Sequence, residues 1–134
     1  MIKQLNHIGI AVKNLEDSIA IFQKLFGNEN IHREIVPEQK VKIASFKVGD
    51  VIIELTSPLG QDSPIAGFLE KRGEGIHHLA FESDNIQSDL NRLAQNSVKL
   101  INETPQAGAH DMLIAFLHPK STNGVLIEIC QHKD

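Results

Sequence analysis

The 134-residue chain has little of several residue types, and each shortage argues against a class of protein. Its one cysteine, Cys130, cannot form a disulfide within the chain. It has no tryptophan or tyrosine, only six phenylalanines and no basic cluster, so neither base stacking nor phosphate binding on a nucleic acid is favoured. No segment approaches the roughly 20 consecutive apolar residues that cross a membrane. We therefore expect no nucleic-acid partner and no membrane segment.

The remaining composition is that of a globular protein. Hydrophobic residues make up 41% of the chain, charged residues make up 22%, and the net charge is −4. Residues 1–4 lead directly into a strand pattern without the apolar segment of a signal peptide, which predicts a cytoplasmic protein. The length suits one domain and is too short for two independent ones, so we expect residues 1–134 to share one core.

The chain contains an internal repeat. The segment Asn6-His7-Ile8-Gly9-Ile10-Ala11-Val12 resembles His77-His78-Leu79-Ala80-Phe81-Glu82, and Val51-Ile52-Ile53-Glu54-Leu55 resembles Val125-Leu126-Ile127-Glu128-Ile129. Each half thus begins on a strand with a histidine and ends on a strand with a glutamate. The repeat predicts a first module over 1–58, a linker with a short helix over 59–74, and a second module over 75–134.

Within each module the patterns predict one helix and four strands. The strands are expected near 5–12, 31–36, 40–47, 51–56, 76–82, 99–102, 112–117 and 125–130. The first helix follows an N-cap at Asn14 and ends at Gly27, and the second follows a cap at Asp84. Ser63, Pro64 and Gly73 delimit the linker helix. The fold class is therefore α+β, with two βαβββ modules that pair their sheets.

Four residues of the repeat form a candidate metal site. Strand alternation places His7, Glu54, His78 and Glu128 on the sheet faces opposite the helices. A buried carboxylate is costly unless a partner or a metal neutralises it. Two imidazoles and two carboxylates suit Zn²⁺, Co²⁺, Ni²⁺ or Mn²⁺.

Each of these residues also has an ordinary structural interpretation. A single strand histidine is more often hydrogen-bonded than metal-bound, and a single strand glutamate more often faces solvent. Repetition at equivalent places favours the metal site. His77 is read as structural because it points away from His78, and Cys130 as a small core residue.

With these residues in place, the whole chain resembles the vicinal-oxygen-chelate (glyoxalase/bleomycin resistance) superfamily of paired βαβββ modules around a divalent metal. Within that superfamily, four segments are similar to methylmalonyl-CoA epimerases: Val36 to Gln39, Ser57 to Ala66, Gly75 to Phe81, and His118 to Glu128. The resemblance implies that His7, Glu54, His78 and Glu128 bind the metal, with cobalt expected. In many members the position of Glu54 is glutamine.

The resemblance further implies an enzyme, a metal-dependent epimerase that interconverts the two C2 epimers of methylmalonyl-CoA through a metal-stabilised enolate. We expect Glu128 to move the α-proton, an acyl-CoA to be the substrate, and the protein to be a homodimer. Two alternatives use the same fold: a lactoylglutathione lyase of the glyoxalase I type, and a non-catalytic small-molecule-binding protein. The lyase would act on methylglyoxal with a thiol, and the binding protein would need no metal.

Overall fold

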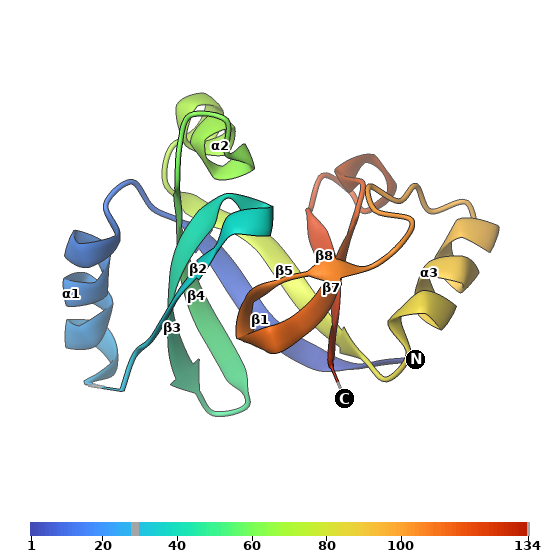
Figure 1. Ribbon diagram of the computed structural model, residues 1–134, viewed down its shortest axis with the longest axis horizontal. Helices are drawn as coiled ribbons and strands as arrows, with labels where there is room; N and C mark the ends of the chain where they lie inside the picture. The colour runs from blue at the N-terminus through green and yellow to red at the C-terminus, as the bar shows by residue number, and fades with distance from the viewer. Residues whose placement is uncertain (28–29, 134) are drawn as a thin grey trace. The chain divides into compact units, whose positions relative to one another are not determined.

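The computed structural model describes residues 1–27 and 30–133, and Figure 1 shows the course of the chain. The element order is βαβββ, a helix, and βαβββ again, which confirms the predicted α+β class and the order of both modules. The bounds are β1 Ile2–Ala11, α1 Leu15–Phe26, β2 His32–Val36, β3 Val41–Val48, β4 Val51–Pro58, α2 Pro64–Arg72, β5 Gly75–Ser83, α3 Ile86–Gln95, β6 Gln106–Ala107, β7 Met112–Leu117 and β8 Ile127–His132. Short 3₁₀ turns cover Pro37–Gln39, Ala109–Asp111 and Pro119–Ser121.

The chain divides into two compact units that do not follow the repeat boundaries. One contains residues 8–77 and is called the 8–77 unit; the other combines residues 1–7 with 78–134 and is called the split unit. Strands β1 and β5 contribute residues to both units. The single domain over 1–134, with its modules at 1–58 and 75–134, stays a prediction.

The 8–77 unit is a small sheet covered by helix α1. Its strand order is β2-β3-β4-β1, and β3 runs antiparallel to both β2 and β4. Helix α1 begins after Asn14, whose side chain accepts the Asp17 N–H, and ends at Gly27 with φ 63°. Both ends were predicted. Along α1 the apolar stripe packs against the sheet around Phe46, Leu55 and Val12.

Helix α2 follows β4 in the same unit, as predicted for the linker. Ser63 caps it, with its hydroxyl accepting the Ile65 N–H at 3.2 Å, Pro64 takes the first position, and Gly73 ends it at φ 78°. Among the described residues, none of the helices has both the length and the apolar character that crossing a membrane requires.

The split unit is a mixed sheet covered by helix α3. Its strand order is β1-β5-β8-β7-β6; β5 and β8 are parallel, whereas β7 is antiparallel to β8 and to β6. The helix packs through Ile86 and Leu90 onto Ala115, Leu117 and Ile129. A second apolar cluster in the unit contains Ala80, Met112, Ile114 and Cys130. Cys130 is fully buried, so its prediction as a core residue is confirmed.

Three local predictions in the split unit were wrong. The cap of α3 is Asn85 and not Asp84, because the Asn85 side chain accepts the Ser88 N–H. The strand expected at 99–102 is reduced to a single bridge between Leu100 and Leu117. There the Asn102 side chain accepts the Phe116 N–H at 2.8 Å and so replaces a backbone partner in the ladder.

The short strand β6 takes that edge position instead, pairing with Leu113 and Ile114 of β7. The last strand also begins later than predicted, at Ile127. Val125 is held in a turn, in which the Thr122 hydroxyl donates to the Val125 carbonyl at 2.6 Å and the Val125 N–H donates to the Thr122 backbone carbonyl at 3.0 Å.

Candidate metal centre

Three of the four predicted ligands lie together inside the split unit. His7 lies on β1, His78 on β5 and Glu128 on β8, and all three side chains are buried. The two imidazole Nε2 atoms are 3.2 Å apart, and the rings meet edge to face. Glu128 reaches both rings: Oε2 is 3.5 Å from His7 Nε2, and Oε1 is 3.5 Å from His78 Nε2. Three strands therefore bring two nitrogens and a carboxylate to one point.

Strand register accounts for the position of Glu128. On one side it pairs with Ala80 of the parallel strand β5, and on the other with Phe116 of β7. Ala80 is small and fully buried, so it leaves room for the carboxylate and the His78 ring. The Phe116 ring packs edge to face on His78, with centroids 5.9 Å apart. The alternation of small and aromatic neighbours thus sets the carboxylate between the two imidazoles.

The surroundings of His7 include a hydrogen bond that the sequence interpretation missed. Asn6 is buried, and its Oδ1 lies 2.7 Å from His7 Nδ1. The only sequence signal was position, because Asn6 directly precedes His7 and its repeat counterpart is His77. That counterpart behaves differently, since the His77 ring lies edge to face on Phe68 in the 8–77 unit, with centroids 4.9 Å apart.

The fourth predicted ligand, Glu54, belongs to the 8–77 unit. It lies in the middle of β4, where it pairs with Ser45 of β3, and 6% of its surface is exposed. The expectation that this strand carries a buried carboxylate is therefore correct. Its role as a metal ligand stays a prediction.

The donor set of the split unit fits a divalent ion. Ligand atoms that share one ion at bonds of about 2.1 Å lie about 3.0 to 3.4 Å from one another, close to the separations of 3.2 and 3.5 Å found here. Cys130 is a further neighbour: its Sγ, one imidazole nitrogen of His7 and one oxygen of Glu128 lie within 4.8 Å of one another. Imidazole nitrogen and carboxylate oxygen are the ligands of catalytic Zn²⁺ and Co²⁺ sites.

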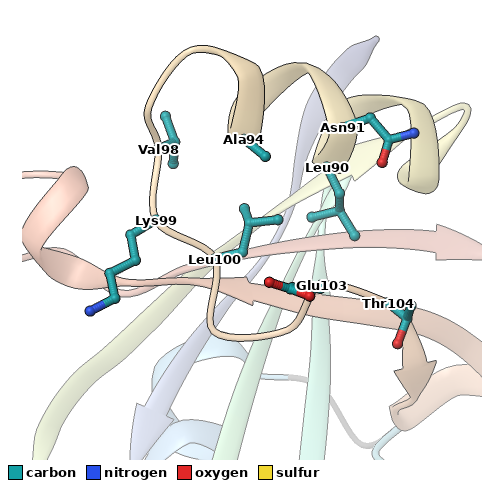
Figure 2. A pocket seen from close by; sticks show the side chains of 8 residues that line it. All are labelled: Leu90, Asn91, Ala94, Val98, Lys99, Leu100, Glu103 and Thr104. Carbon is teal, nitrogen blue, oxygen red and sulfur yellow. The ribbon is translucent and has the colours of Figure 1, made fainter.

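A pocket of the split unit lies elsewhere. It is bounded by the second half of α3 and the segment that follows it, and Figure 2 shows its side chains. Its lining combines aliphatic side chains, among them Leu90 and Leu100, with the polar side chains of Asn91, Lys99 and Glu103. None of the predicted ligands lines it. The candidate chemistry therefore rests on the buried cluster and not on this pocket.

Comparison with known proteins agrees with the geometry. Residues 6–116 match the family model of the glyoxalase/bleomycin resistance protein/dioxygenase superfamily. The chain is 44% identical to the uncharacterized protein YqjC of Bacillus subtilis over 130 residues, covering 97% of this chain and 93% of that protein. It is 39% identical to the ethylmalonyl-CoA/methylmalonyl-CoA epimerase of Cereibacter sphaeroides over 133 residues, covering 98% and 99%.

Solved structures extend the match to three dimensions. A methylmalonyl-CoA epimerase in complex with methylmalonyl-CoA and NH₄⁺ superimposes with a TM-score of 0.94 at 31% identity, covering 98% of this chain and 96% of that one. The predicted resemblance to methylmalonyl-CoA epimerases, which are isomerases, is thereby confirmed. The chain belongs to the glyoxalase/bleomycin resistance protein/dioxygenase superfamily.

Proposed function

We propose that the protein interconverts the two C2 epimers of methylmalonyl-CoA by removing the α-proton from one face of C2 and returning a proton to the opposite face of the resulting enolate, which requires a proton donor in addition to the base. The observation that carries this proposal is the buried cluster of His7, His78 and Glu128, in which one carboxylate faces two imidazole nitrogens. Relatives named as epimerases, at 39% and 31% identity over nearly the whole chain, support it.

The reaction needs a base for a weakly acidic proton. The α-carbon of methylmalonyl-CoA lies between a thioester and a carboxylate, and removal of its proton leaves an enolate whose charge must be stabilised as it forms. Glu128 is the carboxylate we assign to proton removal. Its backbone is fixed between β5 and β7, so the oxygens are held in one orientation, and burial keeps competing water away.

His7, His78 and Glu128, with Glu54 as the fourth ligand, are the residues that we propose hold a divalent metal. The bound ion would supply a Lewis acid that stabilises the negative charge of the enolate. We propose Co²⁺ as the native ion; Zn²⁺, Ni²⁺ and Mn²⁺ are accepted by the same types of donor. The two histidines flank the carboxylate, since the Nε2 atom of each imidazole lies 3.5 Å from one of its oxygens.

The proposal includes an acyl-CoA as the substrate, a cytoplasmic location and a homodimer. The acyl-CoA is supported by the solved structure of an epimerase in complex with methylmalonyl-CoA. The dimer is tested by light scattering on the purified protein at several concentrations, where a mass of one chain at every concentration contradicts it.

The decisive experiment follows the α-proton. The protein is stripped of metal with a chelator, restored with Co²⁺, and mixed with methylmalonyl-CoA in D₂O. Proton NMR then follows exchange at the α-carbon while the conversion of one epimer into the other is measured. We expect both processes to depend on the metal and to be lost on renewed chelation.

The same preparation tests the alternatives. Absence of exchange in a folded, metal-loaded protein rejects the epimerase. Turnover of methylglyoxal with glutathione in that protein identifies a lyase instead. Failure of the protein to take up any divalent metal rejects both enzymes and leaves the binding protein. As a control for the site, His7→Ala is expected to lower the ratio of bound metal to protein, and an unchanged ratio removes His7 from the ligand set.

A further inference from the structure

The hydrogen bond between Asn6 and His7 determines which nitrogen of the imidazole is available. The Asn6 Oδ1 atom can only accept, so at 2.7 Å from His7 Nδ1 it requires the hydrogen of the neutral ring to lie on Nδ1. The lone pair of that ring is then on Nε2. This is the nitrogen that faces His78 Nε2 and the Glu128 carboxylate.

A second contact fixes the orientation of the amide itself. Asn6 Nδ2 donates to Glu82 Oε1 at 2.9 Å, across from β1 to β5. A carboxylate can only accept, so the amide nitrogen must point to Glu82 and the amide oxygen to His7. The assignment of the two amide atoms is therefore set by the network.

The network ends at the surface of the split unit. Glu82 Oε1 also lies 3.7 Å from Nε2 of His132, the last residue of β8. The side chain of Glu82 is 23% exposed and that of His132 is 63% exposed, whereas that of His7 is 6% exposed. A line of polar contacts thus runs from the buried cluster to solvent across three strands.

We propose that Asn6 is a positioning residue for the metal centre: it holds His7 in the Nδ1–H tautomer, with Nε2 directed at the metal, and Glu82 holds Asn6. This inference rests on the proposed function, because it assumes that His7 is a ligand. Partners of this kind orient a ligating imidazole, and their removal costs about 10- to 100-fold in metal affinity.

The test measures metal binding and tautomer, not only turnover. Affinity for Co²⁺ is determined by competition with a chelator, and the His7 tautomer by ¹⁵N NMR of the metal-free protein. Asn6→Leu keeps the size of the side chain but removes the acceptor, so we expect Co²⁺ affinity to fall by about 10- to 100-fold and the preference for Nδ1–H to weaken. The matched control is Asn91→Leu on α3, an exposed position, where affinity is expected to stay unchanged.

A double variant that exchanges the amide of Asn6 and the carboxylate of Glu82 shows whether Asn6 acts through its hydrogen bonds or only through its packing. In the double variant Asn6→Asp with Glu82→Gln, the carboxylate accepts from His7 Nδ1 and the new amide at position 82 can donate to it. We expect this pair to restore most of the affinity and the Nδ1–H tautomer. If Asn6→Leu does not fold, Glu82→Leu gives a second test, because it removes the anchor and is expected to weaken Co²⁺ binding in the same direction.

The outcomes distinguish this inference from the proposed function. If the natural chain binds no divalent metal, both fail. If it binds Co²⁺ and catalyses exchange, while Asn6→Leu or, failing that, Glu82→Leu binds equally well with an unchanged tautomer, the positioning role is overturned and the proposed function stands. Weaker binding in the folded variant together with rescue by the double variant supports the role of Asn6.

Discussion

The helices α1 and α3 occupy equivalent places in the repeat, but the side chains packed beneath the two helices differ in type. Under α1, in the 8–77 unit, Phe46 lies with its ring centroid 6.3 Å from Phe22 and 5.7 Å from Phe26, an aromatic cluster. Under α3, in the split unit, the fully buried Leu90 packs among buried aliphatic residues, and among the described residues a single aromatic ring, that of the partly buried Phe81, lies against this cluster. One face of α3 also buries an acid, Asp89.

Asp89 is held by a polar network at the start of α3. The Ser83 hydroxyl donates to its carboxylate at 2.5 Å, and the Arg92 guanidinium donates at 3.1 Å. Burial on its own raises the pKa of Asp89, but these hydrogen bonds and the nearby ammonium of Met1 outweigh it and hold the pKa below the usual value. The repeat therefore preserves the order of elements without preserving what fills the space beneath each helix.

The largest expected difference between equivalent positions concerns the two glutamates. Glu128→Gln keeps the shape of the side chain but removes the base, so we expect epimerisation to fall by about 10²- to 10⁴-fold. Glu54→Gln is the repeat-matched variant, and we expect a smaller loss because an amide oxygen still offers a neutral ligand. The rate of α-proton exchange in D₂O and the metal content are measured for both. Equal rates for Glu128→Gln and the natural chain contradict its role as the base.

The aromatic and aliphatic cores give the next largest difference. Phe46→Ala is expected to lower the free energy of unfolding by about 3 to 5 kcal/mol, because it leaves a cavity beneath α1. Leu90→Ala is expected to cost about 2 to 5 kcal/mol, at the lower end if the aliphatic neighbours close around it. Urea unfolding gives both values. The control is Leu25→Ala on α1, where the side chain is 69% exposed and a change within about 0.5 kcal/mol is expected.

The buried acid gives a difference that depends on pH. Because the folded pKa of Asp89 is lowered, its contribution to stability is present above the unfolded pKa, about 3.9, and is lost as the pH falls through the folded pKa. Asp89→Asn is expected to cost about 1.5 to 3 kcal/mol at pH 7. Urea unfolding at pH 7 and at pH 3 compares the variant with the natural chain. A difference that does not shrink at the lower pH shows that the charge of Asp89 is not the cause.

The comparison also explains what could be predicted from the sequence. Elements with a strong period and clear end residues, such as α1 between Asn14 and Gly27, were placed correctly because local chemistry determines them. Strand alternation and the repeat also predicted that His7, His78 and Glu128 lie on the same face of the sheet, since the strand register determines the face on which a side chain lies.

The errors arose where side chains replace backbone partners. The Asn102 amide takes the place of a ladder contact to Phe116, so an apolar segment near 99–102 does not become a strand. The choice of Asn85 over Asp84 as the cap depends on where the helix begins, which is set in part by Gln131 of β8. The contact of Asn6 with Glu82 joins residues 76 positions apart and has no local pattern.

The helix caps provide the smallest comparison. Asn14 accepts the Asp17 N–H at 3.0 Å at the start of α1, and Asn85 accepts the Ser88 N–H at 3.1 Å at the start of α3. The first turn of α3 has additional support, because Gln131 Oε1 accepts the Ile86 N–H at 2.7 Å. Replacement of a capping Asn by Ala costs about 0.5 to 2 kcal/mol, whereas replacement by Gly costs only a few tenths.

We therefore expect Asn14→Ala to lower the free energy of unfolding more than Asn85→Ala does, with the corresponding Gly variants close to the natural chain. Urea unfolding of the four variants is the measurement. A larger loss in the free energy of unfolding for Asn85→Ala would mean that the contact of Gln131 with the Ile86 N–H forms only when the cap is present and does not stabilise the first turn independently. In that case adding Gln131→Ala to Asn85→Ala would cost little more, whereas two independent supports would give additive losses.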